Sequence, residues 1–139
     1  MRKMVLVMFV FLVFQNFWNP LNLVISSSQS EGNEVKLSKG DNGREITIEI
    51  GDVLHIELKR FGGTGYEWYL DESYEKYFEL MKKGTETLQS RNLVGTPVVR
   101  TWELIAIEKG ETEIRLFLYR NWEGQDKAVE TFKVKVKIL

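Results

Sequence analysis

Side chains able to do covalent or metal chemistry are scarce in this chain. It holds no cysteine and a single histidine, His55. A metal site built on thiolates or histidines therefore lacks its ligands, and the usual pairs of nucleophile and base cannot be assembled. The 20 acidic residues leave a two-carboxylate mechanism formally open, but no recognisable motif places such a pair. We therefore expect no enzyme, no metal and no cofactor.

Three segments between predicted strands are the candidates for a binding function. Residues 61–66, 92–99 and 120–127 read FGGTGY, NLVGTPVV and RNWEGQDK. Each also has a structural interpretation, because glycines supply the positive φ of tight turns. Trp122 departs from that interpretation most, since it stands among polar residues: such a tryptophan is either folded back or offered to a partner. Tryptophan and arginine are over-represented among the residues that dominate interface energies.

The composition is that of one ordinary soluble domain. The chain has 139 residues, of which 43% are hydrophobic and 28% charged, with a net charge of −1. No basic cluster with interleaved aromatic residues is present, so we expect no nucleic-acid partner. Nothing in the sequence suggests an obligate dimer, and we expect a monomer.

The N-terminus differs in kind from the rest. Arg2 and Lys3 precede an apolar run over residues 4–14, and serines follow at 26–28. This order is typical of an export signal, and the run is short for a bilayer span, which needs about 20 apolar residues. We expect a signal peptide over residues 1–28, with an uncleaved signal anchor as the alternative. The protein would then be secreted or exposed at the cell envelope, and would meet a membrane only if the signal is retained.

The elements that must position the three segments are strands. A polar lead-in over residues 29–44, with a possible first strand at 34–37, precedes or overlaps a domain expected over 34–139. Alternating or aromatic runs predict further strands, and turn dipeptides separate some of them. They cover residues 45–50, 53–59, 66–70, 100–108, 111–119 and 129–138. The pattern predicts an all-β sandwich or barrel.

Several finer expectations follow from the same pattern. Ile46, Ile48 and Ile50 should share an inward face, and His55 should lie on the polar face of its strand. The lysines at 133, 135 and 137 suit solvent or a sheet edge. Trp68 and Trp102 fall in strand-like runs and should be core or half-buried. Residues 71–84 break the pattern, and a short helix between Asp71 and Gly84 is a weaker hypothesis.

On these residues the chain resembles the chagasin-type inhibitors of papain-like cysteine peptidases. Their first loop has the form Asn-Pro-Thr-Thr-Gly-aromatic-x-Trp, and Thr64, Gly65, Tyr66 and Trp68 match it. Their second loop, Gly-x-Gly-Gly, is matched only by the leading Gly95 and, downstream, by an aromatic residue. Their third, Arg-Pro-Trp, is matched by Arg120-Asn121-Trp122, with Asn at the Pro position. Phe61-Gly62-Gly63 replaces Asn-Pro-Thr in the first loop, which removes one proline and one hydroxyl.

The resemblance implies an immunoglobulin-like β-sandwich and reversible, non-covalent inhibition. The first loop would enter the active-site cleft of a papain-like cysteine peptidase, and the other two would clamp its sides. The residues that this assigns to peptidase binding are Gly62, Gly63, Thr64, Gly65, Tyr66, Gly95, Thr96, Pro97, Arg120, Asn121 and Trp122. The alternative is an immunoglobulin-like recognition or adhesion module at the cell surface that does not inhibit. The target peptidase is left open.

Overall fold

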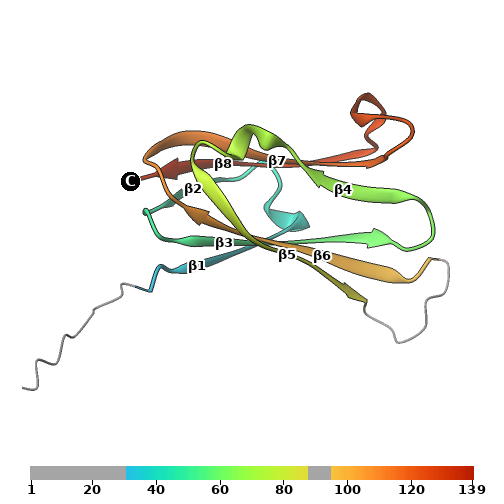
Figure 1. Ribbon diagram of the computed structural model, residues 1–139, viewed down its shortest axis with the longest axis horizontal. Helices are drawn as coiled ribbons and strands as arrows, with labels where there is room; N and C mark the ends of the chain where they lie inside the picture. The colour runs from blue at the N-terminus through green and yellow to red at the C-terminus, as the bar shows by residue number, and fades with distance from the viewer. Residues whose placement is uncertain (1–30, 88–94) are drawn as a thin grey trace, which may run out of the picture.

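Two facing β-sheets make up the part of the protein that the computed structural model describes, residues 31–87 and 95–139 (Figure 1). The strands of these residues are β1 Glu34–Ser38, β2 Glu45–Ile48, β3 Val53–Phe61, β4 Tyr66–Leu70, β5 Phe78–Thr87, β6 Pro97–Ala106, β7 Gly110–Arg120 and β8 Glu130–Ile138. Three 3₁₀ turns accompany them: η1 Lys39–Asp41, η2 Glu72–Tyr74 and η3 Gln125–Lys127. The predicted export signal lies outside the described residues. Among the helical segments described, none is long and apolar enough to cross a membrane.

The strands form two four-stranded sheets. One has the order β1-β3-β6-β5 and the other β2-β8-β7-β4. The pairs β1–β3 and β2–β8 are parallel, and the remaining pairs are antiparallel. This arrangement is the immunoglobulin-like sandwich that the resemblance implied.

The core lies between the two sheets and follows the period of two in the strands. Trp68 and Trp102, expected in the core, are 2% and 1% exposed. They pack with aliphatic side chains of both sheets, among them Leu54, Ile56 and Leu58. His55 lies on the opposite, outer face, where its Nε2 is 3.0 Å from a carboxylate oxygen of Glu57. Residues that alternate in the sequence thus alternate between the buried and the outer face of the strand.

The lysines of β8 were expected to face solvent or to mark a sheet edge, and the structure confirms the first of these and not the second. It lies between β2 and β7, inside its sheet. The lysines at 133, 135 and 137 are exposed, while Phe132, Val134 and Val136 are buried. These lysines therefore face solvent from a central strand, and the sheet edges are β2 and β4.

The helix hypothesis for residues 71–84 is wrong beyond one turn. Asp71 stands at the N-cap position of η2, which ends at Tyr74. From Phe78 the chain runs as β5, paired with β6 along its length. Pairing with β6 makes this segment a strand. Its alternation is hard to see in the sequence because Met81 is an extra residue at a register shift between Leu80 and Lys82. Such a bulge on an edge strand disturbs its regular pairing surface.

The second correction concerns Ile50, which is 48% exposed. Strand β2 ends at Ile48 because Asp52 closes a turn there. One carboxylate oxygen of Asp52 accepts a hydrogen bond from the Glu49 amide at 2.8 Å. The other accepts one from the Asn33 amide at 2.8 Å. Asp52 is only 6% exposed, so the turn depends on a buried carboxylate.

We predict that Asp52→Ala lowers the free energy of unfolding by about 2–3 kcal/mol, because two amide donors lose their acceptor in a buried place. Asp52→Asn should lose less, since one oxygen remains. Urea unfolding of the three proteins measures the difference. A loss of less than about 0.5 kcal/mol for Asp52→Ala, the range of neutral surface changes, would contradict this role.

Candidate functional site

Three connections meet at one end of the sandwich. There β3 ends and β4 begins, β6 begins, and β7 passes into β8, as the right-hand side of Figure 1 shows. The first loop joins β3 to β4 through residues 62–65. The second leads into β6 and is described from Gly95 onward, so residues 92–94 of the expected segment lie outside the described residues. The third joins β7 to β8 through residues 121–129.

The first and second loops are joined by backbone hydrogen bonds. The amide of Gly62 donates to the carbonyl of Thr96 at 2.9 Å, and the amide of Gly95 donates to the carbonyl of Gly62 at 2.9 Å. A Cβ at Gly62 would lie 3.3 Å from the Thr96 carbonyl oxygen, which is a tight contact. The missing side chain therefore lets the two backbones approach.

The first and third loops are joined through Arg120. Its Nε donates to the carbonyl of Thr64 at 3.1 Å. Its guanidinium carbon lies 4.5 Å from the ring centroid of Tyr66 and 5.9 Å from that of Trp122. Both distances suit cation–π attraction, whose usual limit is about 6 Å. The arginine thus links residues from both loops.

The indole of Trp122 lies directly over Gly65. A Cβ built at Gly65 would collide with the ring. The φ of Gly65 is 80°, a region that residues with a side chain avoid. Glycine is therefore required there for the backbone and for the contact, and Trp122 is held by the first loop although it is 72% exposed.

The tip of the first loop has its own hydrogen bonds. The hydroxyl of Thr64 donates to the carbonyl of Phe61 at 2.8 Å and accepts from the amide of Tyr66 at 3.4 Å. The φ of Gly63 is 75°. The tip is therefore a defined turn despite its three glycines.

The structure brings most of the predicted site residues together, but it places Pro97 in a strand. Gly62 to Tyr66, Arg120 and Trp122 come together, and Asn121 is exposed beside them. Thr96 is 6% exposed and reaches the first loop through its carbonyl. Pro97 was expected in a loop but is the first residue of β6, where it is paired with Phe61. A proline suits the start of a strand because its missing amide costs no ladder hydrogen bond there.

Phe61 was not among the predicted site residues, and the structure brings it to the same end. Its side chain is 64% exposed, while its backbone is held by the Thr64 hydroxyl and by pairing with Pro97. The signal in the sequence was the substitution itself, a large apolar residue at a position where the family pattern has asparagine. Phe61 and Trp122 are both large, apolar and exposed at the loop end.

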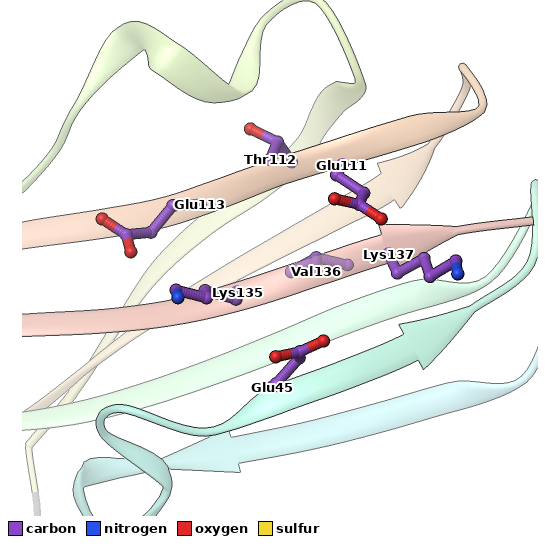
Figure 2. A pocket seen from close by; sticks show the side chains of 7 residues that line it. All are labelled: Glu45, Glu111, Thr112, Glu113, Lys135, Val136 and Lys137. Atoms are coloured by element: carbon purple, nitrogen blue, oxygen red, sulfur yellow. The ribbon is translucent and has the colours of Figure 1, made fainter.

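A pocket on the outer face of the β2-β8-β7 sheet is a second place where a partner could bind (Figure 2). Its lining includes Glu45, Glu111 and Glu113 with Lys135 and Lys137. The strand register places Lys135 opposite both Glu45 and Glu113, and Lys137 opposite Glu111. This is the neighbouring of opposite charges that stabilises a solvated sheet face, and it lies toward the start of β7, away from the three loops.

Comparison with known proteins identifies one family. Residues 47–136 match the family described as Chagasin family peptidase inhibitor I42. Chagasin of Trypanosoma cruzi is 23% identical over 108 residues, which cover 73% of this chain and 96% of chagasin. The crystal structure of the cysteine protease inhibitor EhICP2 from Entamoeba histolytica has a TM-score of 0.69 and 23% identity, covering 77% of this chain and 96% of that one. The structure of PbICP-C in complex with falcipain-2 has a TM-score of 0.50 and 17% identity, covering 78% of this chain and 100% of that one.

The family match begins in β2, ends in β8 and includes all three loops. It confirms the resemblance drawn from the loop residues, and a family of peptidase inhibitors agrees with the expectation that the chain is not an enzyme. The chain belongs to the chagasin family of peptidase inhibitors.

Proposed function

We propose that this protein inhibits papain-like cysteine peptidases by placing its first loop, residues 62–65, in the active-site cleft. The second and third loops would contact the two sides of that cleft. One observation carries the proposal: Thr64 at the tip and Trp122 in the third loop belong to one connected surface, through Arg120 and Gly65. The family, and the falcipain-2 complex of one structural relative, support a peptidase of this class as the partner.

The geometry of the tip suits a blocker that is not cut. A peptidase cleft accepts extended chain, whereas residues 62–65 form a turn with positive φ at Gly63 and Gly65. A turn does not present a peptide bond in the orientation that attack requires. Glycines, which have no Cβ, also let the backbone come close to catalytic groups. Inhibition would then rest on contacts and be reversible.

Affinity would come from surfaces that are ordered before binding. Backbone hydrogen bonds at Gly62 and Gly95, and the Arg120 bond to Thr64, hold the three loops together. Loops ordered in the free protein lose less conformational entropy when they bind. Trp122 and Phe61 would add apolar area on the flanks of the tip, since both are largely exposed and aromatic side chains are enriched in interface cores.

The proposal is tested by titrating purified protein into papain or a cathepsin-like peptidase and following hydrolysis of a small substrate. We expect competitive, reversible inhibition with a dissociation constant well below micromolar, as complexes with preorganised surfaces of this kind reach. Intact inhibitor should be recovered after long incubation. Inhibition at micromolar concentrations or weaker would favour the recognition module without inhibitory activity.

We predict that Trp122→Ala weakens inhibition by about 2 kcal/mol or more, a loss typical of an interface tryptophan, while thermal stability stays near that of the wild type. Ile50→Ala is the matched control, because Ile50 is also exposed and apolar but lies before β3, at the other end of the sandwich. It should leave the inhibition constant unchanged. Equal effects of the two substitutions would remove Trp122 from the interface.

We also predict that Gly65→Ala moves the Trp122 ring, and that the positive φ of Gly65 costs about 1–2 kcal/mol of stability once a Cβ is present. Gly43→Ala isolates the backbone cost, since Gly43 has a φ of 83° and open space around its Cβ position. Only Gly65→Ala should shift the indole N–H resonance of Trp122 and weaken inhibition. Unchanged resonance and inhibition in Gly65→Ala would show that the ring does not depend on this contact.

A further inference from the structure

Behind the first loop, one carboxylate joins three strands from both sheets. Glu67 lies on β4, one residue after Tyr66. Its Oε1 is 2.8 Å from Nε of Arg100 on β6, and its Oε2 is 3.1 Å from Nε of Arg60 on β3. Arg100 also reaches the hydroxyl of Thr85 on β5. The first-loop motif leaves this position open, as the residue between the aromatic and the tryptophan, and we drew no role for it from the sequence.

The three side chains are sheltered from solvent. Those of Arg60 and Arg100 are 19% exposed, and that of Glu67 is 20% exposed. A pair so enclosed is screened less than an ordinary surface ion pair, and removing one partner leaves charges unpaired where water cannot fully replace it. Here two guanidinium groups share one carboxylate, so loss of the Glu67 charge leaves both arginines without an ion-pair partner among residues 31–87 and 95–139.

The position of this cluster relates it to the loops. Strands β3 and β4 carry the two ends of the first loop, and β6 follows the second. Strand β4 belongs to one sheet, and β3 and β6 belong to the other. The indole of Trp68 bridges the sheets at the same level by donating to the carbonyl of Lys59 at 3.0 Å. The Glu67 carboxylate is therefore a connection between the sheets at the bases of two binding loops.

We propose that Glu67 is a positioning residue for inhibition. This role rests on the proposed function. The Glu67 charge holds β3, β4 and β6 at the spacing in which Gly62 bonds to Thr96 and Gly95 bonds to Gly62. Without that charge the arginines repel each other and the strand ends separate, so the loops must be ordered when the peptidase binds. The expected consequence is a loss of affinity larger than the loss of stability alone would produce.

The same strand offers a matched control at its other end. Asp71 follows β4 directly, and its Oδ2 is 2.7 Å from Arg115 of β7, with 24% of its side chain exposed. A hydrogen bond with Ser73, followed by Arg115, lowers the pKa of Asp71 below its usual value. Asp71→Asn therefore removes a carboxylate of similar burial that also pairs β4 with an arginine, but far from the loops.

The test compares Glu67→Gln with Asp71→Asn in the otherwise intact protein. Both should lower the melting temperature by a few degrees, in keeping with the loss of one partly buried ion pair in a domain of this size. Glu67→Gln should raise the inhibition constant about tenfold, because loop ordering then opposes binding, whereas Asp71→Asn should leave it unchanged. Equal inhibition constants for the two variants would overturn the positioning role.

Hydrogen exchange gives a readout that does not depend on inhibition. The amides of Gly62 and Gly95 should exchange about tenfold faster in Glu67→Gln, as local opening becomes easier, and at the wild-type rate in Asp71→Asn. Unchanged exchange in Glu67→Gln overturns the inference.

If the wild-type protein failed to inhibit, the proposed function would be wrong, but hydrogen exchange would still decide whether Glu67 positions the loops. If Glu67→Gln did not fold, Arg60→Gln would keep the Glu67–Arg100 pair but remove the link between β4 and β3. It should still speed exchange at Gly62, and an unchanged rate there overturns the inference.

Discussion

Strand register at one end of the sandwich is the constraint on which the rest of the molecule depends. Phe61 is opposite Pro97 in the β3–β6 pair, and Tyr66 is opposite Arg120 in the β4–β7 pair. A slip of one residue would turn every side chain of a strand to its other face. Trp68 and Trp102 prevent such a slip, since each would leave the core. Burial in the centre of the domain therefore determines which residues stand at the bases of the loops.

Beyond those bases the loops are held mainly by backbone hydrogen bonds, so few side chains lose conformational entropy. Backbone amides and carbonyls join the first loop to the second, and one arginine and one indole join it to the third. Glycine is essential to this arrangement because the indole occupies the space of a side chain at Gly65. A surface made in this way has a defined shape before a partner binds. It suits a partner that offers a cleft, which is the form of a peptidase active site.

The outer sheet face and the loop end differ in the large apolar side chains that they expose. On the outer face of the β2-β8-β7 sheet, lysines and glutamates neighbour one another across strands and keep that face solvated (Figure 2). At the loop end, the exposed side chains include the aromatic rings of Phe61 and Trp122. Two charged side chains there are held by neighbours, Arg120 against Thr64 and Glu67 between two arginines. Glu123, Asp126 and Lys127 of the third loop are exposed, so the end where the partner is proposed to bind offers apolar rings beside charged groups.

The sequence by itself determined the all-β class and most of the strands, because a period of two in apolar residues gives strands with one face to bury, in a sandwich or a barrel. It also indicated the loop residues, since Thr64, Gly65, Arg120 and Trp122 stand in a recognisable order. It misjudged residues 71–84, Ile50 and Pro97, where pairing partners or a distant carboxylate set the local structure. It could not show that Trp122 rests on Gly65, that Phe61 is exposed beside them, or that Glu67 joins two arginines. These contacts link residues 7 to 57 positions apart, and only the folding of one sheet onto the other decides which distant side chains meet.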